Sequence, residues 1–128
     1  MKKPTIILGV LLASATAFAG LKSSAPVYIG TNMAAGSLGT ARNGTDALQY
    51  MECFTMTTVG ATATTTSLAC YARDIAGKSV ACYGTNPALV AQVRALKGDS
   101  FLQFSWDANG QCTQIWVNDS SGYAPKNP

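Results

Sequence analysis

Hydrophobic and polar residues alternate over several short stretches of the chain, a pattern that predicts antiparallel β-strands. The clearest unit is residues 67–84, in which two alternating runs flank Asp74 and Gly77. Aspartate suits the first position of a type I turn, and glycine suits the left-handed residue that closes a three-residue loop. This turn predicts a β-hairpin whose register places Cys70 directly opposite Cys82.

The two faces of this predicted hairpin differ in chemistry. The face with the cysteines also carries Leu68, Ala72 and Val80, which are the apolar side chains that a core needs. The opposite face carries Tyr71 and Tyr83, together with Arg73, Ser79 and Ala81. A mixed aromatic and polar face suits a surface that meets a ligand. We therefore expect a binding surface here that involves Tyr71 and Tyr83 more than the two tryptophans.

The remaining pattern predicts four further strands and one helix. The strands are expected over residues 27–29, 47–58, 100–106 and 111–118, and residues 64–73 lead into the hairpin described above. A helix over 87–97 begins at an Asn-Pro pair and carries Leu89, Val93 and Leu96 on one stripe. Residues 33–46 contain three glycines and are expected to form a loop. The fold class is therefore α+β, a small antiparallel sheet of five or six strands with one helix packed on a face.

The C-terminal hairpin contains both tryptophans. A turn over Asp107 to Gly110 with the same three-residue loop places Trp106 opposite Cys112 and Leu102 opposite Trp116. This register predicts that Trp106 and Trp116 are core residues. The alternative is that they form an exposed aromatic platform for a sugar ring or a partner protein.

Residues 1–19 have the features of a secretory signal peptide. Lys2 and Lys3 precede an apolar run, and an Ala-Phe-Ala cleavage site ends at Ala19. The apolar run is too short to span a bilayer comfortably, so no stable membrane insertion is expected. We expect a mature chain of residues 20–128 that forms one domain with an irregular tail from about 119, in the periplasm or outside the cell.

Four cysteines in an exported domain predict two disulfides. The hairpin register favours Cys70–Cys82, which leaves Cys53–Cys112. The alternative is Cys53–Cys70 with Cys82–Cys112, because a hairpin between 47–58 and 64–73 would also bring Cys53 near Cys70.

The composition excludes several kinds of chemistry. The chain has no histidine, which removes Ser-His-Asp and Cys-His catalysis and histidine-ligated zinc. Two of the nine basic residues lie in the predicted signal peptide, and the others nearly balance the six acidic residues. The mature chain is therefore close to neutral, and nucleic acid is not an expected partner. No Cys-x-x-Cys or phosphate-binding motif is present. We predict no catalytic residue, no metal site and no cofactor.

Three functional hypotheses remain. The first is an exported, non-enzymatic binding or structural module of the bacterial cell envelope or the extracellular space, with a protein or a glycan as its partner. The second is a proteinaceous inhibitor of an extracytoplasmic hydrolase, which inserts loop 33–46 or loop 59–66. The third, which the sequence supports least, is a carboxylate-based hydrolase that uses Glu52 with an aspartate.

Overall fold

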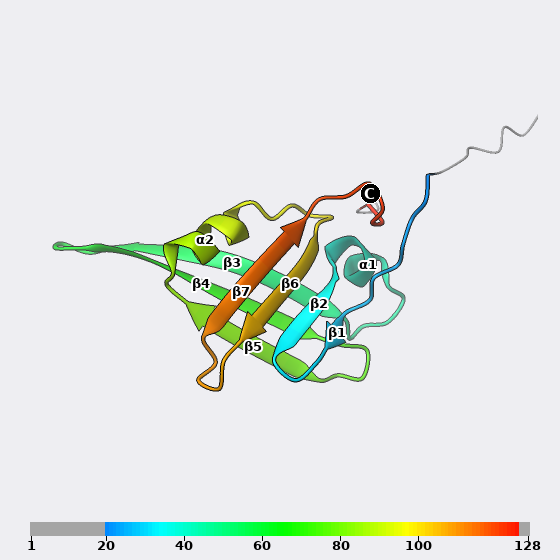
Figure 1. The fold of residues 1–128 in the computed structure, drawn as a ribbon, viewed down its shortest axis with the longest axis horizontal. Helices are drawn as coiled ribbons and strands as arrows, with labels where there is room; N and C mark the ends of the chain where they lie inside the picture. The colour runs from blue at the N-terminus through cyan, green and yellow to red at the C-terminus, as the bar shows by residue number, and fades with distance from the viewer. Residues whose placement is uncertain (1–19, 126–128) are drawn as a thin grey trace, which may run out of the picture.

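The computed structural model describes residues 20–125; the predicted signal peptide over residues 1–19 lies outside the described residues. Figure 1 shows the arrangement of two helices and seven strands. In chain order these are β1 (Tyr28–Ile29), β2 (Met33–Ser37), α1 (Leu38–Asn43), β3 (Tyr50–Val59), β4 (Thr64–Arg73), β5 (Ser79–Gly84), α2 (Pro87–Arg94), β6 (Phe101–Trp106) and β7 (Cys112–Asn118).

The strands form two antiparallel sheets rather than the single sheet expected from the sequence. One sheet has the order β1-β2-β6-β7 and the other has the order β3-β4-β5. The difference arises at residues 33–37, whose glycine content predicted a loop. These residues instead form β2, which pairs with β6 from Met33 opposite Ser105 to Ser37 opposite Phe101. The C-terminal hairpin therefore belongs to a sheet of its own, and the protein is mostly β.

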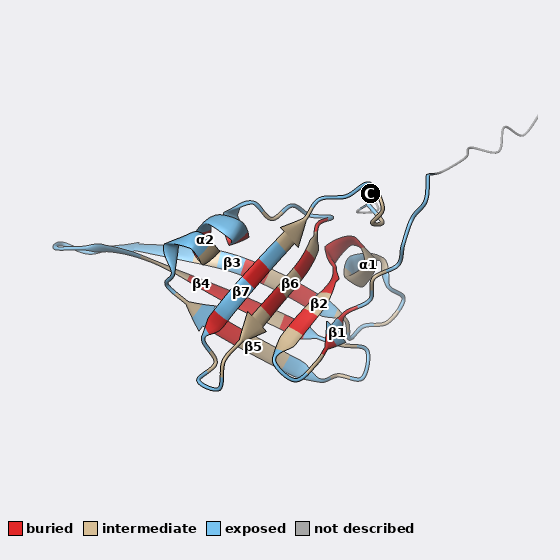
Figure 2. Cartoon of the chain, in the orientation of Figure 1, coloured by how far each residue is buried: buried red, intermediate tan, exposed pale blue. Residues whose placement is uncertain are grey.

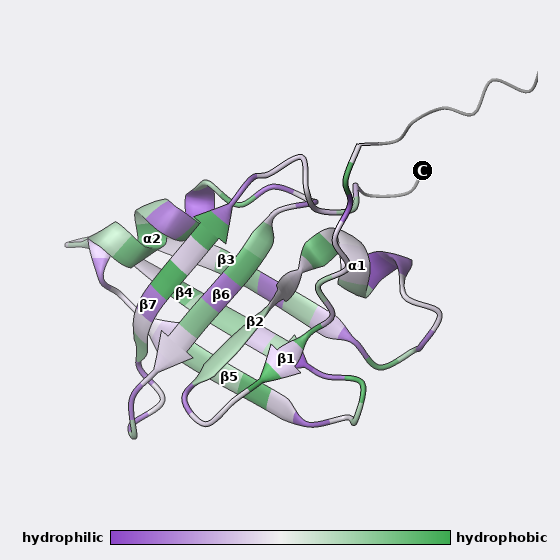
Figure 3. Cartoon of the chain, turned by 45° about the vertical axis from the view of Figure 1, so that its right-hand side comes forward, coloured by the Kyte–Doolittle hydropathy of each residue, from purple (hydrophilic) through white to green (hydrophobic). Residues whose placement is uncertain are grey.

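The core lies between the two sheets (Figure 2), and β6 supplies its largest fully buried side chains. Leu102 and Phe104 are both completely buried. Hydrophobic and polar residues alternate along β6 from Leu102 to Ser105 (Figure 3), as expected for a strand that covers a core with one face only. Burial of such side chains typically contributes about 1.5–3 kcal/mol each.

The two predicted turns are present. Gly77 and Gly110 have φ values of 82° and 74°, in the left-handed region that glycine adopts without strain. The Asp74 N–H donates to the Lys78 carbonyl at 3.0 Å. Cys70 lies directly opposite Cys82 in the strand register, as predicted.

The predicted register of the C-terminal hairpin is correct only near its turn. Trp106 does lie opposite Cys112, but a β-bulge at Ser105/Trp106 shifts the rest of the ladder. Gln103 rather than Leu102 therefore lies opposite Trp116. A one-residue shift turns a side chain to the other face, so the prediction that Trp116 is a core residue is wrong.

The disulfides are Cys53–Cys70 and Cys82–Cys112, so the pairing favoured from the sequence is wrong. The Cα atoms of Cys53 and Cys70 are 4.1 Å apart, close to the spacing of a non-hydrogen-bonded antiparallel pair. In a central strand such as β4, Cys70 then directs its N–H and C=O toward Cys82. That pair is the wider, hydrogen-bonded kind, with Cα atoms about 5.5 Å apart. Both Cys53 and Cys82 lie opposite Cys70, so the strand register alone does not select its disulfide partner. The partner is selected by which of the two pairs is the closer, non-hydrogen-bonded one.

Both helices differ from the sequence prediction. Helix α1 replaces part of the expected loop, and the Ser37 hydroxyl accepts a hydrogen bond from the Thr40 N–H at 3.4 Å as its N-cap. Helix α2 starts after Asn86, as predicted, but it ends at Arg94. Its buried residues are Val90 and Val93, while Leu89 and Leu96 are only partly buried.

The tail after β7 has no helix or strand through residue 125, as expected, but side chains attach it to the body. The Lys22 ammonium donates to the Ser121 carbonyl at 2.7 Å, and the Tyr123 ring stacks on Phe101 with centroids 5.1 Å apart. Lys97 and Asp119 form an ion pair at 2.6 Å.

No helix within residues 20–125 is long and apolar enough to cross a membrane. The two disulfides point to an oxidising, extracytoplasmic location.

We predict that Leu102→Ala lowers the free energy of unfolding by about 2–5 kcal/mol, because the side chain is fully buried between the sheets. Leu21→Ala is the matched control, since Leu21 is 88% exposed, and its effect should lie within about 0.5 kcal/mol. Urea unfolding with both disulfides intact measures the two changes. Equal effects of the two substitutions would contradict the placement of the core.

Candidate functional site

Three cysteines on adjacent strands are each followed by an aromatic residue. The pairs are Cys53-Phe54 on β3, Cys70-Tyr71 on β4 and Cys82-Tyr83 on β5. Successive residues of a strand point to opposite faces. Because the cysteines point into the core, the three rings lie on the outer face of the three-stranded sheet. We call Phe54, Tyr71 and Tyr83 the aromatic cluster.

The rings of the aromatic cluster contact one another diagonally across the strands. Phe54 and Tyr71 are stacked, with centroids 6.1 Å apart and an interplanar angle of 11°. Tyr71 and Tyr83 meet edge to face at 5.9 Å, and the Tyr71 hydroxyl donates to the Tyr83 hydroxyl at 3.1 Å. Diagonal neighbours on a sheet lie within reach of aromatic side chains. Phe54 and Tyr83 remain 44% and 49% exposed.

A depression of about 460 Å³ lies beside the cluster. Ala69 lies directly between Phe54 and Tyr83 in the register, and its small side chain leaves space between the two larger ones. The depression is lined by Phe54, Met56, Ser67, Leu68, Ala69, Tyr71, Tyr83, Gly84, Thr85 and Gln111. None of these residues is charged. Its volume falls within the range of small-molecule sites.

Charged residues lie at the margin of this face. Glu52 is directly opposite Tyr71, and Arg73 is opposite Tyr50 at the end of β4. Partial burial raises the pKa of Tyr50 to about 12, and a hydrogen bond with Glu52 acts in the same direction. The hydrogen bond to Tyr83 raises the pKa of Tyr71, because it stabilises the neutral phenol. Both tyrosines are therefore neutral at physiological pH.

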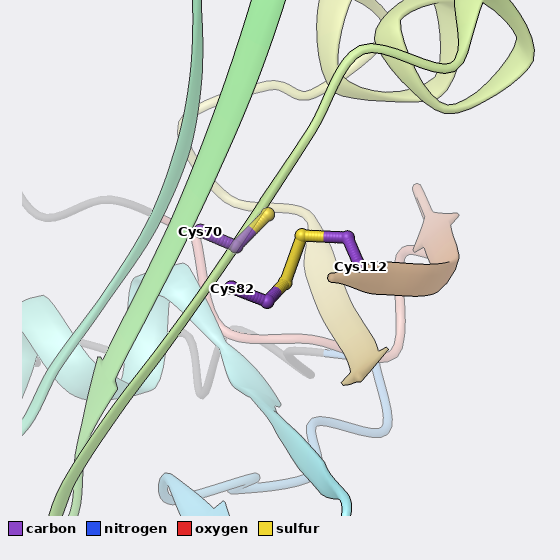
Figure 4. Close-up of side chains that lie close together, drawn as sticks. All are labelled: Cys70, Cys82 and Cys112. Atoms are coloured by element: carbon purple, nitrogen blue, oxygen red, sulfur yellow. A yellow bond between two sulfur atoms is a disulfide. The ribbon is translucent and has the colours of Figure 1, made fainter. Parts of the chain in front are cut away.

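The core side of the same strands is cross-linked. Figure 4 shows the Sγ atom of Cys70 directed toward the Cys82–Cys112 disulfide, and the sulfurs of these three cysteines lie within 4.8 Å of one another. Among residues 20–125 they are the only group of three or more potential metal ligands this close together. All three are in disulfides, so they offer no thiolate to a metal ion.

The structure brings together only some of the residues singled out from the sequence. Tyr71 and Tyr83 are neighbours, and Arg73 lies on the same face next to Tyr71. Trp106 is partly buried and packs on Phe104 at 5.7 Å between centroids. Trp116 is 49% exposed on the outer face of the other sheet. The two tryptophans therefore do not belong to the aromatic cluster.

Phe54 was missed as a site residue in the sequence analysis. The disulfide pairing favoured from the sequence does not align the strand of Phe54 with Tyr71. The recurrence of cysteine followed by an aromatic residue, at positions 53, 70 and 82, is the signal that could have identified it.

Most carboxylates have local structural roles. Asp46, Asp74 and Asp107 accept hydrogen bonds from backbone N–H groups in their own turns. Asp119 is paired with Lys97 and hydrogen-bonded to Ser100, and these contacts lower its pKa. Glu52 forms no ion pair with a residue in the described part of the chain.

Comparisons with protein-family models, with curated proteins and with solved structures found no significant match to this chain.

We predict that Tyr83→Phe lowers the pKa of Tyr71 toward its ordinary value of 10, because the hydroxyl that accepts its hydrogen bond is removed. Ultraviolet titration of the tyrosines should then show one phenol fewer and an earlier ionisation of Tyr71. Tyr28→Phe, on β1, is the control: it removes one phenol and should leave Tyr71 unchanged. If the tyrosines that remain in the two variants gave the same titration curve, the Tyr71–Tyr83 contact would be contradicted.

Proposed function

We propose that this protein is an exported, non-enzymatic binding module that acts at the bacterial cell envelope or outside the cell. Its binding surface is the outer face of the β3-β4-β5 sheet, centred on the aromatic cluster and the depression beside it. The partner is an envelope or extracellular protein or glycan.

One observation carries this proposal: Phe54 and Tyr83 remain 44% and 49% exposed, and both contact the partly buried Tyr71, although the protein has a buried core elsewhere. Exposed aromatic patches that are bordered by polar groups mark interaction sites. Without a partner, such a patch leaves apolar surface in contact with water, which is unfavourable. The ring contacts and the tyrosine hydrogen bond fix the orientation of the rings before binding. A surface ordered in advance loses little conformational entropy on association.

The remaining chemistry favours binding over catalysis. The chain has no histidine, and the aspartates at positions 46, 74, 107 and 119 have structural hydrogen bonds or ion pairs. The aromatic cluster supplies no nucleophile with an adjacent base.

A second function, inhibition of an extracytoplasmic hydrolase, is favoured by the β3–β4 hairpin. Its end projects away from the body of the protein (Figure 1), and every residue from 56 to 65 is exposed. The projection is ordered, because the Thr57 and Thr66 hydroxyls are 3.0 Å apart across it and the Gly60 N–H donates to the Ala63 carbonyl at 2.8 Å. Such an arm has the shape of an element that enters an enzyme cleft. We call residues 56–65 the hairpin arm.

The aromatic cluster is tested by combining Tyr71→Ala with Tyr83→Ala. Both rings lie outside the core, so the double variant should fold with both disulfides and should lose about tenfold or more in retention on isolated envelope and secreted material. The control is Trp116→Ala, on the other sheet, which should be retained like the unmodified protein. Full retention of the double variant would overturn the proposed surface.

The hairpin arm is tested separately by replacing residues 57–66 with a two-residue Asn-Gly turn, which preserves the strand pairing below it. The binding module should tolerate this change and keep its retention. Loss of retention in this variant, with the aromatic cluster intact, would favour the inhibitor instead.

A further inference from the structure

We propose that the depression beside the aromatic cluster binds an uncharged glycan of β-1,4-linked pyranose rings whose hydroxyl groups are equatorial. This inference rests on the proposed function, because it names the chemical class of ligand for the same surface.

The absence of charge in the lining indicates a neutral ligand. All ten residues that line the depression are uncharged, and Glu52 and Arg73 lie outside it. A charged ligand would exchange part of its hydration shell for aromatic rings, with no opposite charge to compensate. A neutral ligand avoids this cost, whereas neither a polyanion nor a basic segment finds an opposite charge within the lining itself.

The lining is also amphipathic. Phe54 and Met56 supply apolar surface on β3. The lining also contains side chains with hydroxyl or amide groups, from Tyr71, Tyr83, Thr85, Gln111 and Ser67. A wholly apolar ligand would cover these polar groups without hydrogen-bonding to them, which is unfavourable. A pyranose ring with equatorial hydroxyls has flat C–H faces and a polar edge, so it can stack on the rings and hydrogen-bond at their margin in one pose.

The backbone next to the cluster disfavours an extended peptide. Peptides often add as a strand to a free sheet edge. At the β5 edge, however, the Tyr83 N–H already donates to the Gly110 carbonyl at 3.1 Å. The Cys82–Cys112 disulfide joins β5 to β7 at the same place. On this edge a peptide would therefore find the Tyr83 N–H already bonded, whereas a glycan needs no backbone ladder.

The dimensions suit more than one sugar ring. The aromatic cluster crosses three strands, and neighbouring strands lie about 4.8 Å apart, so the cluster spans about 10 Å. A β-1,4-linked chain of equatorial pyranoses is a flat, extended ribbon that can lie across these strands. We infer that at least two consecutive rings make contact.

The test is a titration of the exported, disulfide-bonded protein with cellotetraose and with tetra-N-acetylchitotetraose, followed by nuclear magnetic resonance of the backbone amides. Both probes have the required linkage and equatorial hydroxyls, and they differ in the acetamido group. β-1,4-Mannotetraose, with an axial hydroxyl, and the cationic chitosan tetramer are the matched negative probes. We expect at least one of the two equatorial neutral probes to shift amides around residues 54, 71 and 83, and both negative probes to bind about tenfold more weakly.

Three alanine variants test which residues form the glycan-binding site. Phe54→Ala and Tyr83→Ala should each weaken binding by about tenfold. Trp116→Ala should have no effect, although Trp116 is as exposed as Tyr83, at 49%. Near-ultraviolet circular dichroism verifies that each variant is folded.

Two results would overturn the inference. If neither neutral probe binds at millimolar concentration, while envelope retention still depends on Tyr71 and Tyr83, the glycan assignment fails and the proposed binding function stands with a protein partner. If a probe binds but only Trp116→Ala weakens it, the assigned site is wrong.

Discussion

The structure depends on one alignment, the row in which Cys53, Cys70 and Cys82 lie side by side on β3, β4 and β5. One disulfide joins the first two strands of the row, and the other joins the third strand to β7 in the opposite sheet. Each bridge typically contributes about 2–4 kcal/mol in a domain this small. Together they fix the register within the smaller sheet and the attachment of that sheet to its neighbour.

This alignment also determines what the outer face presents. A strand alternates its faces residue by residue, so fixing the cysteines toward the core fixes Phe54, Tyr71 and Tyr83 toward solvent. A slip of one residue in any of the three strands would exchange the two faces of that strand. The disulfides therefore hold the rings of the candidate site in place although they touch no ligand, and stability and binding share the same constraint.

Local sequence signals predicted the local features well. The Asp-x-x-Gly turns, the register that places Cys70 opposite Cys82, the strands other than β2 and the start of α2 all follow from short-range chemistry. The faces of the 67–84 hairpin were also predicted, and with them the positions of Tyr71 and Tyr83.

The features that could not be predicted depend on distant parts of the chain. Residues 33–37 become a strand only because β6, far along the sequence, provides a pairing partner. The β-bulge near Trp106 moved Trp116 to the outer face, and no local residue signals it. Cys70 is opposed by a cysteine on both sides, so the choice of partner depends on which pair is hydrogen-bonded.

The most direct measurement is a tryptic map of the unreduced protein. Cleavage after arginine and lysine places Cys53 and Cys70 together in peptide 43–73, Cys82 in peptide 79–94 and Cys112 in peptide 98–126. The structure predicts that peptide 43–73 is released alone with an internal bridge, and that 79–94 is joined to 98–126. A single species that joins all three peptides would show that Cys70 bonds outside the β3–β4 hairpin, and it would contradict the Cys53–Cys70 bridge that holds these two strands in the alignment of the candidate site.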